Sequence, residues 1–200
     1  MTIPKTIEHP PHVRQRLLDA ALQLFSTKGY AATSVRELVE AAGVTKPVLY
    51  YYFKNKEGLY LALMQESLGD FYQAAHQAVS APGCVTERII GYCTTLLNIF
   101  VARLDVARLI FAIFYGPPQG APHIDFEASF NTMLTDMERL VSEGISNGEF
   151  RPIDPSDAAW TIVAQLNVTM EEQLCHNRQP RVDQARLVRL LSLLFEGIKA

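Results

Sequence analysis

Apolar residues recur with helical spacing along most of this chain, and no segment shows the sustained alternation expected of a β-strand. Between breaks marked by proline and glycine, the pattern predicts helices over about residues 13–28, 34–42, 45–53, 56–80, 85–103, 105–115, 126–147, 154–176 and 182–198. The sequence therefore predicts an all-α protein of about nine helices. Its 200 residues, 48% of them hydrophobic, suffice for a sizeable core in one or two domains.

The most informative pattern lies in residues 33–53, where two short helices are joined by a turn. Ser34 and Glu37 have the spacing of a capping box, in which each caps a free N–H group of the other residue. Gly43 supplies the backbone freedom that a sharp turn requires, and Thr45 is expected to cap the second helix. These signals predict a helix-turn-helix.

The second of these helices is expected to leave a polar and aromatic face exposed. Leu49 and Phe53, four residues apart, can pack against the first helix. The side chains left outward are Lys46, Val48, Tyr50 and Tyr51. An ammonium group and phenols are donors suited to phosphate oxygens and base edges, which favours entry into a DNA major groove. The same corner also fits a helical carrier or interaction protein that binds no DNA.

Residues 14–60 carry three runs, AALQLFSTKGYAATSV, AAGVTKPVLYYYF and KNKEGLY, in this order. The segment resembles the N-terminal DNA-binding domain of the tetracycline-repressor (TetR) family. Three prolines and few apolar residues predict a flexible N-terminal arm over 1–12. The resemblance implies a three-helix DNA-binding domain over 13–58 and a larger ligand-binding and dimerisation domain over 59–200. Val39 stands where the family usually has a small Ala. Pro47 and Val48 replace residues that are often Gly and small polar, which predicts more apolar base contacts.

The predicted partner is double-stranded operator DNA. Lys56 is expected at a helix N-terminus, where free N–H groups and the helix dipole favour a phosphate. Together with the exposed face described above, the resemblance implies the DNA contacts Thr33, Thr45, Lys46, Pro47, Val48, Tyr50, Tyr51 and Lys56.

Charge is distributed unevenly along the chain. The first 60 residues contain eight basic and five acidic residues, a net charge of +3, whereas the rest contain ten basic and sixteen acidic residues, a net charge of −6. A basic N-terminal part on an acidic body suits a protein that presents one end to a polyanion.

The last two helices are apolar on more than one side, so they require burial on two sides. Pairing with a two-fold mate in a four-helix bundle would provide it, and the TetR resemblance also implies a homodimer. Burial wholly within one subunit is the alternative. The residues expected at the dimer interface are Val163, Leu166, Met170, Leu187, Leu190, Leu191 and Leu194.

The central helices are rich in aromatic residues, which either fill the core or line an apolar ligand cavity. The resemblance implies a small apolar effector that releases a repressor from DNA, and a transcriptional activator is the alternative. The residues expected at the pocket are Tyr92, Phe111, Phe130, Trp160, Gln165 and Asn167.

Several other classes of protein receive no support. The sequence has no Gly-rich phosphate loop, HExxH or GxSxG motif, so we expect neither an enzyme nor a cofactor. Cys84, Cys93 and Cys175 lack metal-type spacing, leave an odd thiol and suit a reducing compartment. No apolar run approaches the length of a membrane span and no signal peptide is evident, which predicts a cytoplasmic protein.

Overall fold

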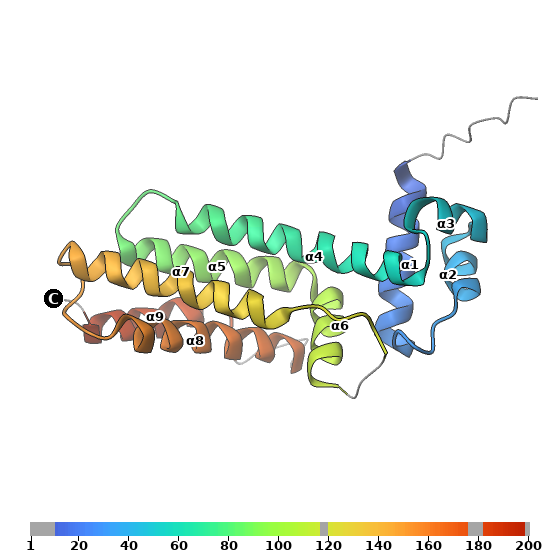
Figure 1. Cartoon of the computed structure of the whole chain (residues 1–200). Coiled ribbons are helices and arrows are strands. Elements are labelled where there is room, and N and C mark those ends of the chain that lie inside the picture. The colour runs from blue at the N-terminus through green and yellow to red at the C-terminus, as the bar shows by residue number, and fades with distance from the viewer. Residues whose placement is uncertain (1–10, 117–119, 176–181, 199–200) are drawn as a thin grey trace, which may run out of the picture. The chain divides into compact units, whose positions relative to one another are not determined.

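The computed structural model describes residues 11–116, 120–175 and 182–198, and these residues form nine α-helices (Figure 1). They divide into two compact units. Unit 1 runs from the N-terminus to Ser67 and includes Arg108–His123, and unit 2 comprises Leu68–Ala107 and Ile124–Ala200. The predicted all-α class is confirmed, but the predicted division after residue 58 differs from this one. The predicted N-terminal arm, residues 1–12, falls largely outside the described residues.

Unit 1 is built on three helices and the start of a fourth. They are α1 (Pro11–Lys28), α2 (Val35–Ala42), α3 (Lys46–Phe53) and α4 (Lys56–Val79), which continues into unit 2. Each turns an apolar stripe inward, so Leu17, Leu38, Leu49 and Leu59 are all completely buried. The C-terminal part of α6 (Leu104–Tyr115) also belongs to this unit.

An aromatic cluster joins three parts of unit 1. The Tyr30 ring, after the end of α1, lies 5.3 Å from Phe25 and 5.1 Å from Tyr60 of α4, measured between ring centroids. Phe25 and Tyr60 also meet edge-on at 5.9 Å. Edge-to-face contacts of this kind add to the stabilisation from burial. The cluster fixes the α1–α2 connection against the first turns of α4.

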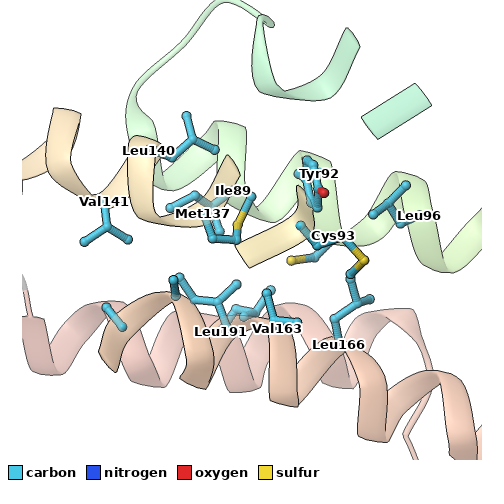
Figure 2. Packing of buried hydrophobic residues seen from close by; sticks show 14 of the residues in the cluster. Ile89, Tyr92, Cys93, Leu96, Met137, Leu140, Val141, Val163, Leu166 and Leu191 are labelled. Atoms are coloured by element: carbon cyan, nitrogen blue, oxygen red, sulfur yellow. The ribbon is translucent and has the colours of Figure 1, made fainter. Parts of the chain in front are cut away.

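Unit 2 is a helical bundle in which α5 (Val85–Ala102) packs against three other helices, α7 (Phe126–Ser146), α8 (Pro155–Cys175) and α9 (Gln184–Ile198). The second half of α4 contributes Ala75 and Val79 to the same core. Figure 2 shows side chains from α5 and α7 meeting those from α8 and α9 in one continuous apolar layer.

Two local features close the end of this bundle. Phe150, after α7, lies against Gly144, where any side chain would collide with its ring. The Phe150 ring then stacks on Phe195 of α9, with ring centroids 5.7 Å apart and planes 4° from parallel. The Glu149 carboxylate accepts hydrogen bonds from the N–H groups of Val85 and Thr86, both at 2.8 Å, and so caps α5.

The predicted helix boundaries agree with the observed ones to within two residues, apart from the ends that fall in undescribed segments. The last helix begins at Gln184 rather than 182 because the Asp183 carboxylate accepts from the Arg186 N–H at 2.8 Å and caps it. In the described part of the chain, no helix is long and apolar enough to cross a membrane.

Candidate nucleic-acid interface

The corner between α2 and α3 is defined by its caps. Ser34 accepts a hydrogen bond from the Glu37 N–H at 3.2 Å, and the Glu37 carboxylate accepts from the Ser34 N–H at 2.9 Å, so the predicted capping box is present. Gly43 ends α2 in the left-handed region at φ 60°, and the next N–H, of Val44, donates to Val39 at 2.9 Å. The sequence interpretation of this turn is therefore correct.

A side chain from α1 holds the same turn in place. The Arg16 guanidinium donates hydrogen bonds to the backbone carbonyls of Ala42 and Gly43, the second at 2.9 Å. A β-carbon at position 43 would come within 2.7 Å of the guanidinium, so Gly43 also leaves room for this bond. Sequence reasoning missed Arg16, because neither its spacing nor its residue type distinguishes it from any other exposed basic residue of α1.

Helix α3 has one buried and one exposed face. Leu49 is completely buried and Phe53 nearly so, as predicted. On the opposite side Lys46, Pro47, Tyr50 and Tyr51 are exposed, Tyr51 by 69%, and Val48 is half-buried. We call these five residues the α3 outer face. It is aromatic and cationic without a carboxylate, which suits a phosphate-lined surface.

Thr45 precedes this face and is exposed. It occupies the N-cap position in extended backbone conformation, but its side chain makes no capping hydrogen bond, contrary to the prediction. The first N–H groups of α3 beyond Pro47 bond instead to the Thr45 carbonyl, from Val48 at 3.1 Å and Leu49 at 3.3 Å. The hydroxyl is therefore not used to cap the helix and remains at the surface next to Lys46.

Two predicted DNA contacts are turned inward, which corrects the prediction. Thr33 is 1% exposed, and its hydroxyl donates to the Gly29 carbonyl at 2.8 Å. The Lys56 ammonium donates to the Tyr30 carbonyl at 2.9 Å and to the Thr33 carbonyl at 3.0 Å, and it lies 4.2 Å from the Tyr30 ring centroid. Burial lowers the Lys56 pKa. Lys56 therefore ties the α1–α2 connection to α4, and neither residue belongs to the exposed face.

The turn between α3 and α4 is unusually tight. The Asn55 N–H donates to the Phe53 carbonyl at 2.7 Å, which makes a γ-turn with Lys54 at its centre, and Lys54 has φ 63° and ψ −42°. A γ-turn with positive φ is rare and strained. The Asn55 side chain then accepts from the Gly58 N–H at 2.7 Å and caps α4. A side chain at Gly58 would collide with the Phe53 carbonyl.

Nearby charges divide into paired and unpaired sets. The Arg36 guanidinium donates to Glu40 at 2.7 Å, and the Lys28 ammonium pairs with Glu37. The hydrogen bonds from Lys28 and Ser34 lower the Glu37 pKa to about 2. Lys46 and Lys54 are exposed and form no ion pair with any residue that the structure describes. These two lysines therefore carry the positive charge at the two ends of α3.

The six residues predicted for a ligand pocket are distributed over both units, five in unit 2 and Phe111 in unit 1. Tyr92 is buried in the core of unit 2, whereas Phe111 belongs to unit 1. Trp160 is 52% exposed and contacts the half-buried Phe130, with ring centroids 5.4 Å apart. Gln165 and Asn167 on α8 are half-buried.

The residues predicted at the dimer interface also need correction. Five of them are at most 5% exposed and lie in the core of a single subunit, namely Val163, Leu166, Met170, Leu187 and Leu191. Leu190 and Leu194 are half-buried. Sequence periodicity identified the apolar helices correctly but assigned their inner face to the dimer. The apolar side chains left at the surface include Trp160, Ala164 and Val168 of α8 and Leu193 of α9.

Comparisons with known proteins identify a family and relatives that this chain resembles. The family described as bacterial regulatory proteins, tetR family, matches residues 17–63, which contain the whole α2–α3 corner. The HTH-type transcriptional regulator RutR of Escherichia coli K12 is 28% identical over 76% of this chain and 70% of RutR. The fatty acid metabolism regulator protein of Bacillus subtilis is 28% identical over 92% of this chain and 94% of its own.

The likeness extends to solved structures. The TetR family transcriptional regulator PfmR from Thermus thermophilus matches with a TM-score of 0.71, covering 94% of this chain and 97% of PfmR. At 22% sequence identity, this match establishes a shared fold.

Proposed function

This chain belongs to the TetR family of bacterial regulatory proteins and is a DNA-binding transcriptional regulator, and we propose that it acts as a homodimeric repressor released from its operator by a small apolar ligand. The observation that carries the proposal is the α3 outer face. A short helix, buried on one side and preceded by a turn that Arg16 holds in place, presents exposed phenols and an ammonium group on the other. Such a helix suits entry into the major groove.

Within this face we assign different roles by position. Lys46 and Thr45, at the N-terminus of α3, are suited to phosphate oxygens, because an ammonium and a hydroxyl donate to them without sequence preference. Pro47, exposed one residue on, is suited to a thymine methyl group. Tyr50 and Tyr51 follow one helical turn later, so their hydroxyls can reach base edges or the backbone.

Lys56 and Arg16 have a different role in the proposal. Both are bonded to backbone carbonyls within unit 1, so they fix the frame that holds α3 and do not contact DNA. Thr33 supports the same frame from the interior.

The homodimer is proposed to form through the outer sides of α8 and α9. Trp160, Ala164 and Val168 recur every fourth residue and so share one face of α8, and Leu193 extends from α9 with 64% of its surface exposed. A shallow groove lies on α9, lined by Arg186, Arg189, Leu190, Ser192, Leu193 and Glu196. The groove carries positive, negative and apolar side chains. It can therefore be complementary to itself, as a two-fold symmetric contact with a second copy requires.

The effector is proposed to bind in unit 2, whose core of α5, α7 and α8 side chains is almost entirely apolar. The Bacillus subtilis relative is named for fatty acid metabolism, which supports a ligand with an apolar body.

The proposal is tested by anisotropy with duplexes selected from random sequence by the wild-type protein, titrated over a range of salt concentrations. We expect Lys46→Ala to lower the affinity for all duplexes. It should also reduce the salt slope, which is the slope of log affinity against log salt concentration, by roughly one. Arg151→Ala, at an exposed position in unit 2, is the matched control and should leave the slope unchanged. A wild-type protein that selects no duplex, or binds without salt dependence, would be a carrier or interaction protein instead.

A further inference from the structure

Tyr92 brings an unpaired hydroxyl group into the described apolar cluster of unit 2. It is 1% exposed, and its hydroxyl has no hydrogen-bond partner among the described residues. Figure 2 shows its ring on α5 beside Cys93 and Leu96, and its oxygen is the single oxygen drawn in the cluster. Because buried polar groups are almost always hydrogen-bonded, an unpaired phenol in an apolar core calls for a partner.

A carboxylate of α7, that of Asp136, influences Tyr92. Burial is the main reason that the Tyr92 pKa is raised, and the carboxylate of Asp136 raises it further. Asp136 is half-buried, and burial raises its own pKa as well. The Arg139 guanidinium lies 4.0 Å from this carboxylate, and Arg139 and His76 of α4 offset part of the rise in its pKa. A phenol on α5 and a carboxylate on α7 therefore lie in one electrostatic neighbourhood at the border of the core.

We propose that Tyr92 anchors the effector by donating a hydrogen bond to its head, and that this head is a neutral carbonyl on an apolar body. The phenol can donate to a carbonyl oxygen, which supplies the missing acceptor. The Asp136 carboxylate opposes an anionic head at the same place. The apolar side chains around Tyr92, such as Ile89 and Leu96, suit a hydrocarbon body. The inference rests on the proposed function, since it assumes that unit 2 receives the effector.

The test uses methyl octyl ketone as the probe and calorimetry on the full-length protein. Tyr92→Phe removes only the hydroxyl, so ketone affinity should fall about fivefold, as expected for one lost hydrogen bond. Tyr60→Phe is the matched control, because the Tyr60 hydroxyl is equally buried and without a partner but lies in unit 1. It should leave ketone affinity unchanged. Equal ketone affinity in the wild type and Tyr92→Phe would overturn the inference.

Two further measurements sharpen the test. Decanoate, with the same chain length and an anionic head, should bind the wild type more weakly than the ketone, and Asp136→Asn should reduce that difference. The melting temperature of Tyr92→Phe should be unchanged or raised, because no native hydrogen bond is lost. A ketone that fails to bind, decanoate that binds better, or a lowered melting temperature would each overturn the inference. Duplex binding by the same preparation shows separately whether the proposed function survives.

Discussion

Lys56 offers the sharpest test of how unit 1 is held together, because the sequence and the structure assign it opposite roles. The pattern predicts a phosphate contact, whereas the structure shows its ammonium bonded to the carbonyls of Tyr30 and Thr33 and stacked on the Tyr30 ring. Lys56→Met keeps most of the apolar stem and removes the charge. The two carbonyls would then lose their donor.

The expected cost follows from these contacts. Hydrogen bonds from a charged donor contribute about 1.5–3 kcal/mol each when buried, and we take about 1 kcal/mol each because Lys56 is half-exposed. The cation–π contact adds about 0.5 kcal/mol at such a site. Lys56→Met should therefore lower the stability of unit 1 by about 2–3 kcal/mol. Lys54→Met, at an exposed lysine two residues earlier, should change it by less than about 0.5 kcal/mol.

Two measurements separate the roles. Urea unfolding followed by circular dichroism gives the loss of stability, and duplex titrations at several salt concentrations give the number of phosphate contacts. A structural role predicts lower stability with an unchanged salt slope. If Lys56→Met keeps its stability and its salt slope becomes shallower by about one, the ammonium contacts phosphate and our assignment is refuted.

Three other changes have clear expected outcomes. Glu149→Gln should lower the melting temperature at neutral pH, because it weakens the α5 cap. Burial raises the Glu149 pKa, but the hydrogen bonds that the carboxylate accepts outweigh burial, so the pKa is lowered overall. The ionised carboxylate therefore stabilises the fold at pH values above its unfolded pKa near 4.5. The difference between Glu149→Gln and wild type should vanish as pH falls through the lowered value, and a constant difference down to acid pH would contradict this. Gly58→Ala should destabilise the protein by more than about 1 kcal/mol, because the added β-carbon would collide with the Phe53 carbonyl at the end of α3. Gly69→Ala, in open space on the same helix, should stabilise the protein by about 0.5–1 kcal/mol. Thermal melts measure both effects. Leu193→Glu should shift sedimentation toward the monomer without loss of helicity, because Leu193 is exposed. Leu187→Ala, in the core, should instead cost about 2–5 kcal/mol of stability. A dimer that tolerates Leu193→Glu would exclude this part of α9 from the interface.

Local signals in the sequence predicted the helices and their ends well. The capping box of Ser34 and Glu37 and the left-handed Gly43 depend on residues within five positions of one another, so short-range chemistry determines them. The buried pair Leu49 and Phe53 followed in the same way from helical spacing.

The direction of single side chains could not be predicted, because distant residues determine it. Lys56 turns inward toward carbonyls about 25 residues earlier in the chain, which no local pattern encodes. On α8 and α9, apolar residues occur on both sides, so periodicity cannot distinguish the side facing α5 from the side facing solvent. Leu187 and Leu193 look equivalent in the sequence, yet one is completely buried and the other mostly exposed.

The discontinuity of unit 1 limits how this protein can be recombined with its relatives. The chain leaves unit 1 at Ser67, inside α4, and returns to it for Arg108–His123 before leaving again. A chimera that exchanges only the N-terminal segment would join foreign DNA-binding helices to a resident second segment from another protein. Exchanging the N-terminal segment and residues 108–123 together keeps each unit intact. Transfer of DNA specificity between such regulators therefore requires the exchange of two segments of sequence, not one.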